Sequence, residues 1–192
     1  MRIIAGTLRS RRLEAPAGLA TRPTSDRLRE TLFNVLAPRI EGAAFLDLYA
    51  GSGAVGLEAL SRGAARVDFV ERAPAALDVL RANLARLGVN AGYRVHAGSV
   101  RTVLDRIAKI AAFDLVFLDP PYEAAQDYAA TLETLSGKAT GLLTAGAMVI
   151  AEHRRKERLE DQYAGLVRTR LLEQGDAALS FYAMAKKNEA EE

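Results

Sequence analysis

Residues 46–56 read Leu46-Asp47-Leu48-Tyr49-Ala50-Gly51-Ser52-Gly53-Ala54-Val55-Gly56, an apolar run that passes into spaced glycines and then into a helical pattern. Glycine allows positive φ and a close approach of the backbone to a ligand. The helix that follows begins with free N–H groups. The segment also matches G-x-G-x-x-G, and an acidic residue, Glu71, ends the next apolar run 20 residues after Gly51. A strand, a ligand-binding loop and a helix are therefore predicted, with a cofactor of the adenosine type, either NAD or S-adenosylmethionine.

The same alternation of strand and helix continues outward from this segment. The predicted parallel strands are residues 44–49, 66–71, 93–97, 113–119 and 147–153. Helical patterns lie around 55–61, from Pro74 to about Gly88, over 100–110 and over 127–135. Residues 166–174 and 178–186 alternate around a Gly-Asp turn and predict antiparallel strands. The fold class is therefore α/β, a doubly wound, mostly parallel sheet with helices on both faces.

Residues 1–40 do not follow this alternation. RIIAG and RRLEAP predict a small hairpin, and Thr24 or Ser25 is placed to cap a helix. That helix would present one apolar face, made by Leu28, Leu32, Phe33 and Leu36. We expect three parts: an extension over 1–40 packed on the core, a main domain over 41–186 and a disordered tail over 187–192.

Composition excludes several classes of protein. The chain has 192 residues, of which 49% are apolar, with no Cys and two His. A disulfide framework, a Cys-based zinc site and a Cys nucleophile are excluded, and we expect no metal. No apolar run reaches the ~18 residues of a membrane span, and the N-terminus lacks the apolar stretch of a signal peptide. We expect a cytoplasmic monomer that does not bind membranes.

Positive charge is concentrated at the front of the chain. Residues 1–40 carry eight Arg against three acidic residues, a net charge of +5, whereas the whole chain carries +2. This excess indicates a polyanionic partner; a solvated charged surface is the plainer alternative.

The second unusual stretch is Asp119-Pro120-Pro121-Tyr122, directly after the apolar run over 113–118. In common doubly wound orders the fourth strand lies beside the first, so this stretch should lie across one crevice from the glycine loop. Two prolines stiffen the loop and remove N–H donors. The Asp119 carboxylate and the Pro120 carbonyl remain as acceptors for an exocyclic amine, and Tyr122 offers a face for stacking a base. A turn that merely ends the strand is the alternative.

With these motifs the chain resembles class I S-adenosylmethionine-dependent methyltransferases with a D-P-P-Y motif, and among them the bacterial 16S rRNA guanine-N2 methyltransferase family called RsmD. The resemblance covers RIIAG, RSRRL, DLYAGSGAVGLEALSRGA, Glu71 and LDPPY, and RPTSDRLRETLFNVL is its most specific part. It implies a Rossmann-like methyltransferase sheet that transfers methyl groups from S-adenosylmethionine to a guanine N2 amine in 16S rRNA of the small ribosomal subunit.

The resemblance also implies roles for individual residues. Cofactor-binding residues would be Asp47, Tyr49, Ala50, Gly51, Ser52, Gly53, Glu71, Arg72, Ser99 and Val100. Asp47, Gly51 and Gly53 would line the methionine end, Glu71 would hold the ribose, and Ser99 or the Val100 N–H would contact adenine. The catalytic residues would be Asp119, Pro120, Pro121 and Tyr122. From the positive charge at the front of the chain, rather than from the resemblance, the predicted RNA-binding residues are Arg9, Arg11, Arg12, Arg22, Arg27 and Arg29.

Three alternatives stay open at this point. An adenine-N6 methyltransferase acting on DNA or RNA would also suit the D-P-P-Y motif. An NAD-linked oxidoreductase would explain the glycine loop and Glu71 but not the basic front of the chain. A non-enzymatic nucleic-acid-binding module would explain the basic front but not the crevice.

Overall fold

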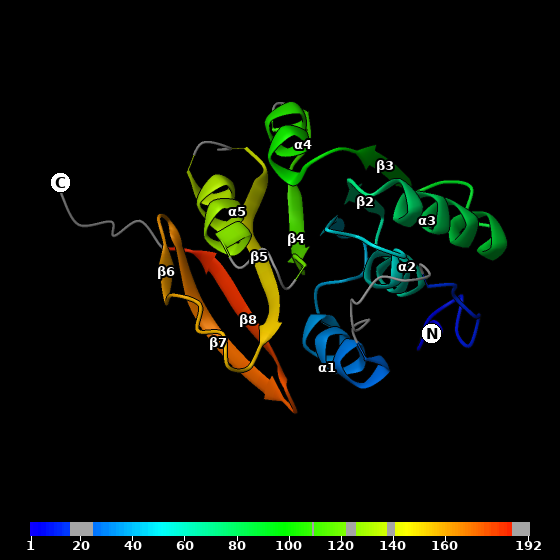
Figure 1. The fold of residues 1–192 in the computed structure, drawn as a ribbon, viewed down its shortest axis with the longest axis horizontal. Coiled ribbons are helices and arrows are strands. Elements are labelled where there is room, and N and C mark those ends of the chain that lie inside the picture. The colour runs from blue at the N-terminus through cyan, green and yellow to red at the C-terminus, as the bar shows by residue number, and fades with distance from the viewer. Residues whose placement is uncertain (16–24, 109, 122–125, 138–140, 186–192) are drawn as a thin grey trace.

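One twisted sheet of eight strands organises the chain (Figure 1). The structure, a computed structural model, describes residues 1–15, 25–108, 110–121, 126–137 and 141–185. The strands are β1 (Ala44–Leu48), β2 (Arg66–Glu71), β3 (Tyr93–Ala97), β4 (Phe113–Leu118), β5 (Leu143–Arg154), β6 (Gln162–Tyr163), β7 (Leu166–Gln174) and β8 (Ala177–Met184). Their order is β3-β2-β1-β4-β5-β8-β7-β6, with β1 to β5 parallel and the last three antiparallel. The predicted fold class is confirmed.

Helices cover both faces of the sheet. They are α1 (Asp26–Leu36), α2 (Ala54–Ser61), α3 (Pro74–Leu87), α4 (Val100–Ile107) and α5 (Gln126–Ser136). One buried apolar cluster joins α1, α2 and α3 to one face of the sheet, through side chains such as Phe33, Leu57 and Leu80. A second cluster joins α4 and α5 to the opposite face, through Val103 and Leu132. Strand order therefore reverses between β1 and β4, and a crevice is expected at the ends of these two strands.

The helix ends follow from local sequence. The Ser25 hydroxyl accepts the Leu28 N–H at 3.1 Å and caps α1, whose apolar face is buried as predicted. Pro74 opens α3, and Gly88 at φ 70° ends it. Among the described helices, none is long and apolar enough to cross a membrane.

Two strands differ from the sequence prediction. β5 begins at Leu143, four residues earlier than expected, because Gly146 lies inside the strand instead of preceding it. The pairing of β4 with β5 shifts register between Phe113 and Leu115, so the strand accommodates this glycine. The two-residue β6 was not predicted, since so short a strand leaves no alternation to detect.

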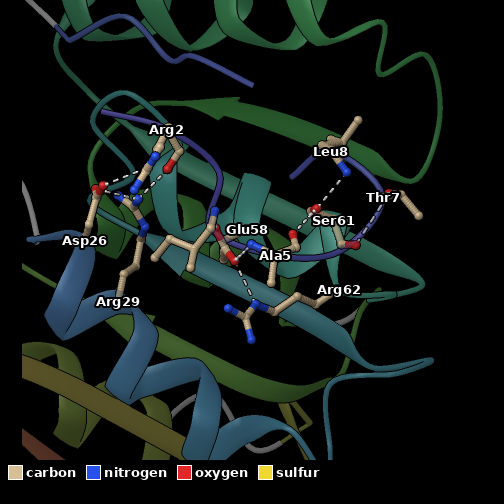
Figure 2. A network of polar contacts seen from close by, with 10 residues as sticks. Arg2, Ala5, Thr7, Leu8, Asp26, Arg29, Glu58, Ser61 and Arg62 are labelled. Atoms are coloured by element: carbon tan, nitrogen blue, oxygen red, sulfur yellow. Dashed lines mark hydrogen bonds and ion pairs between the residues drawn. The ribbon is translucent and has the colours of Figure 1, made fainter. Parts of the chain in front are cut away.

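The N-terminal segment folds back on itself and packs against α2. It forms one antiparallel bridge, Arg2 with Arg12, where a hairpin was expected. The buried Glu58 carboxylate on α2 accepts the Ile4 N–H at 2.7 Å and the Ala5 N–H at 3.0 Å (Figure 2). Ile3 and Leu13 join the apolar cluster of the α1 face. Residues 1–15 are thus attached to the core by both polar and apolar contacts.

Candidate active site

The glycine loop between β1 and α2 depends on left-handed backbone. Tyr49, Gly51 and Gly53 have φ values of 61°, 55° and 79°. A Cβ at Gly53 would lie 2.3 Å from Leu80 Cδ1, so the buried Leu80 side chain would have to shift. A Cβ on Gly51 would meet nothing within 4 Å. Gly53 is therefore favoured by both its left-handed backbone and its packing, whereas Gly51 borders open space beside the loop.

Glu71 ties the end of β2 to this loop. Its Oε2 accepts the Gly51 N–H at 2.8 Å. Its Oε1 accepts the N–H groups of Arg72 and Ala73, both at 2.8 Å. The Glu71 residue is half-buried and Arg72 is exposed. The carboxylate thus lies beside Gly51, with part of the residue accessible to a ligand.

Asp47 lies beneath the loop. Its side chain is buried, and its Oδ2 accepts the Gly56 N–H from the first turn of α2 at 2.9 Å. Burial raises the pKa of Asp47 to about 7, and the Gly56 N–H opposes this shift while the Glu71 charge adds to it. Asp47 therefore binds the first turn of α2, the helix that follows the glycine loop.

Asn83 and Thr131, two polar side chains that support the loop, were not predicted. The Asn83 amide on α3 donates to the Ser52 carbonyl at 3.0 Å and to the Glu14 carbonyl at 3.1 Å. The Tyr49 hydroxyl and the Thr131 hydroxyl on α5 share a hydrogen bond of 3.0 Å. Neither contact has a local sequence signal, because each joins elements far apart in the chain.

The residues after β3 take a capping role. The Ser99 hydroxyl accepts the Thr102 N–H at 3.3 Å and is hydrogen-bonded to the Thr102 hydroxyl at 2.8 Å. Val100 is the first residue of α4, and N–H groups at that position have no partner within the helix. The contact of Ser99 or of the Val100 N–H with adenine stays a prediction.

Asp119 follows β4 at the same edge of the sheet as the glycine loop. Leu118 pairs with Leu48 in register, so Asp119 lies level with Tyr49. Burial raises the pKa of Asp119 well above its ordinary value, and the charges of Glu152 and Asp47 add to the shift. Pro120 is buried and Pro121 exposed, and Tyr122 lies outside the described residues. Asp119 and the glycine loop thus follow neighbouring strands at one edge of the sheet, and a shared crevice between them stays a prediction.

A cleft of about 950 Å³ opens beside Asp119. Its wall includes Ser25 and Arg27 from the start of α1, and Glu152 from the end of β5. The segment 153–156 and the turn 174–177 complete it. The glycine-loop residues are not part of this wall. Asp119, which lies level with Tyr49 of the loop, is part of it. A second hollow of about 280 Å³ lies at the opposite edge, beside Asp114, whose two carboxylate oxygens already bind the Ala44 N–H and the Thr144 hydroxyl.

The predicted RNA-binding arginines fall into separate places. Arg27 is exposed and lines the cleft. Arg9 and Arg11 are exposed beside the C-terminal ends of α2 and α3, away from the glycine loop. Arg12 is also exposed, and Arg22 lies outside the described residues. The cleft is also lined by Arg154, Arg155 and Lys156. These three residues were not predicted, because the turn after β5 carries no motif.

The prediction for Arg29 is wrong. Its side chain is fully buried, so it has no surface with which to meet RNA. Its Nη2 donates to the Arg2 carbonyl at 2.5 Å and to the Asp26 carboxylate at 3.0 Å (Figure 2). Burial lowers the pKa of Arg29, and the charges of Asp26 and Glu58 partly offset that effect. Arg29 joins α1 to the N-terminal segment.

The described residues contain no group of three or more His, Cys, Asp or Glu side chains that could hold a metal ion. The strand order, the glycine loop and the acid ending β2 define a Rossmann-like sheet of the methyltransferase type. "Putative methyltransferase yhhF from Escherichia coli" has the same fold, with a TM-score of 0.83 and 35% identity over 97% of this chain and 99% of that one. An RNA methyltransferase from Salinibacter ruber in complex with S-adenosyl-L-homocysteine shares the fold at 15% identity, with a TM-score of 0.63 over 88% of this chain and 97% of that one.

The family is shown by sequence. A family model described as "Conserved hypothetical protein 95" matches residues 1–183. "Putative rRNA methyltransferase YlbH" of Bacillus subtilis (strain 168) is 36% identical over 183 residues, which cover 95% of this chain and 98% of that protein. "Ribosomal RNA small subunit methyltransferase D" of Escherichia coli (strain K12) is 45% identical over 127 residues, 64% of this chain and 60% of that protein. The chain belongs to the Conserved hypothetical protein 95 family, which is the RsmD family that the sequence resembles.

Proposed function

We propose that this protein transfers a methyl group from S-adenosylmethionine to the exocyclic N2 amine of a guanine in 16S rRNA of the small ribosomal subunit. One observation carries the proposal: Asp119 and the glycine loop follow neighbouring parallel strands, with Leu118 level with Leu48. A donor held by the loop and an amine held by Asp119 would therefore meet at one point. The names of the relatives support rRNA of the small subunit as the substrate class.

The residues of the loop fit this cofactor. The open space beside Gly51 leaves room for a ligand against the backbone, and the Glu71 carboxylate beside it can accept ribose hydroxyls. The Val100 N–H lies at the first position of α4, where it would donate to the adenine ring. A related fold holds S-adenosyl-L-homocysteine. The cofactor supplies a methyl group on a positively charged sulfur, which is already reactive toward an amine.

The chain's own contribution is to hold and orient the amine. The Asp119 carboxylate and the Pro120 carbonyl accept N–H groups of the base and stabilise the positive charge that develops on its nitrogen. Alignment of the reacting atoms is the larger effect, since well-oriented groups gain roughly 7–11 kcal/mol. The raised pKa of Asp119 makes its carboxylate a stronger base, so we assign it the proton that leaves the amine.

RNA would be held around the cleft by positive side chains. Arg27, Arg155 and Lys156 are exposed at its wall, where they can contact phosphates. The target base must leave its stack to reach Asp119. We propose residues 1–40 as the RNA-contacting extension and residues 41–186 as the methyltransferase domain, with the arginines beside the cleft as the principal contacts.

The test is transfer of labelled methyl groups to 30S subunits from a strain that lacks its own enzyme, followed by nucleoside analysis of the rRNA. N2-methylguanosine is the expected product. N6-methyladenosine would establish the adenine alternative, and absence of label in rRNA would overturn the proposal. A thermal-shift comparison of S-adenosylhomocysteine with NADH separates the methyltransferase from the oxidoreductase.

A further inference from the structure

Glu152 is an acidic side chain in the cleft that the proposed chemistry has not used. It lies near the end of β5, where the register pairs Leu118 with Ala151. The next residues, Asp119 and Glu152, are therefore level with each other on neighbouring parallel strands. Glu152 is only 7% exposed, yet it lines the same cleft as Asp119. The Tyr128 hydroxyl donates to the Glu152 carbonyl at 2.7 Å and fixes the backbone at this point.

The carboxyl groups of Asp119 and Glu152 interact electrostatically. After burial, the charge of Glu152 is the largest cause of the raised pKa of Asp119. The buried guanidinium of Arg29 attracts Glu152, which places a positive charge on the same side of the sheet. Two carboxyl groups are thus held at one end of the cleft.

The neighbouring side chain, His153, adds no free donor to this end of the cleft. Its Nε2 is hydrogen-bonded to the Ser180 hydroxyl at 2.9 Å, and its Nδ1 lies 2.9 Å from the Arg154 carbonyl. Since a carbonyl only accepts, Nδ1 carries the proton and donates it there. Asp119 and Glu152 thus place two carboxyl groups at this end of the cleft, and the charge of the Arg29 guanidinium acts on Glu152.

Such a site distinguishes bases by their hydrogen-bond donors. The Watson–Crick edge of guanine offers three N–H groups, one on N1 and two on N2. Adenine offers two N–H groups on N6, and its N1 is an acceptor. An ionised carboxylate can only accept, so it binds the N1–H of guanine and repels the N1 lone pair of adenine.

We propose that Glu152 is a specificity-determining residue that reads the Watson–Crick edge of the target guanine. Its carboxylate accepts the N1–H and shares one N2–H with the Pro120 carbonyl, and Asp119 accepts the other N2–H. This inference rests on the proposed function, because it assigns the base that the same cleft receives. Glu152 takes no part in the transfer of the methyl group; it selects guanine and turns its N2 amine toward Asp119.

The test uses 2-aminopurine, which keeps the N2 amine, has an acceptor in place of N1–H and lacks the O6 oxygen, so a change at Glu152 is needed to isolate the N1 contact. Small subunits are reconstituted with guanine or 2-aminopurine at the mapped methylation site, and kcat/KM is measured on both. The wild type should prefer guanine by roughly 5- to 150-fold, the range for one bidentate base contact. Glu152→Gln should lose most of this preference, because its amide can donate to N1 of 2-aminopurine while its oxygen accepts from N2.

The matched control is Glu133→Gln, which removes one negative charge from an exposed position on α5. It should keep the wild-type preference, and both variants should bind S-adenosylhomocysteine as the wild type does. Equal kcat/KM of the wild type on the two particles would overturn the inference without need of a variant. An unchanged preference in folded Glu152→Gln would overturn it as well.

Failure of the proposed role of Glu152 and failure of the proposed function would give different results. If the wild type methylates guanine but does not discriminate against 2-aminopurine, only the role of Glu152 is lost. If the wild type does not methylate guanine in any particle, the proposed function is lost, and the role of Glu152 is lost with it.

Discussion

The two glycines of the cofactor loop should respond to alanine in opposite ways. Gly53→Ala forces a side chain into left-handed backbone, which costs about 1–2 kcal/mol. Its Cβ would also lie 2.3 Å from Leu80 Cδ1, and overpacking of a buried site costs about 1–3 kcal/mol more. The free energy of unfolding should therefore fall by ~2–5 kcal/mol. Gly51→Ala carries only the backbone cost, about 1–2 kcal/mol, because its Cβ meets open space.

Cofactor binding should show the reverse order. The Cβ at Gly51 would occupy the space that the account assigns to the ligand, so the affinity for S-adenosylhomocysteine should fall at least about tenfold, the equivalent of ~1.4 kcal/mol. Urea unfolding followed by circular dichroism gives the stability of both variants, and calorimetry gives their affinity. The reasoning is refuted if Gly51→Ala binds the ligand as the wild type does, or if it is destabilised as much as Gly53→Ala.

Two further predictions concern buried charge and RNA contact. Because the folded pKa of Asp47 is raised to about 7 from 3.8, the wild type should lose stability relative to Asp47→Asn as pH rises between these values, by up to about 4 kcal/mol. Urea unfolding at pH 5 and pH 8 measures this, and an equal difference at both pH values would contradict it. Arg27→Ala should weaken binding to small subunits and reduce the salt slope by ~1, as loss of one phosphate contact requires. Arg29→Met, at a buried position, should leave the salt slope of a filter-binding titration unchanged, and an equal effect of both changes would count against the assignment.

Much of the fold could be predicted because its signals are local. Alternating apolar runs located β1 to β4 within one residue, and Pro74 and Gly88 marked the ends of α3. The position of the fourth strand beside the first followed from the common orders of doubly wound sheets. The predicted start of β5, at Ala147, was wrong because the strand runs through Gly146 and a register shift of the β4–β5 pair accommodates it.

The candidate site could be predicted only where it is one continuous segment. The glycine loop and the residues after β4 are such segments. Glu152 and Lys156 could not be found, because they reach the cleft through the pairing of β5 with β4 and through the position of α1.

The spacing of Arg29 along α1 indicated that it is buried, but the prediction considered only its charge. Arg29 lies three, four and seven residues before Leu32, Phe33 and Leu36 and so shares their buried face. Spacing along the helix, rather than the sign of its charge, indicated its role.

The central claim is that Asp119 holds the amine and that the glycine loop holds the methyl donor. The most direct measurement compares Asp119→Ala with the wild type in methyl transfer to 30S subunits and in calorimetric binding of S-adenosylhomocysteine. Asp119→Ala should transfer methyl groups at least ~100-fold more slowly, comparable to loss of one group that stabilises developing charge, with the affinity changed by no more than a few-fold. Equal loss of transfer and of cofactor binding, or transfer at the wild-type rate, would contradict it.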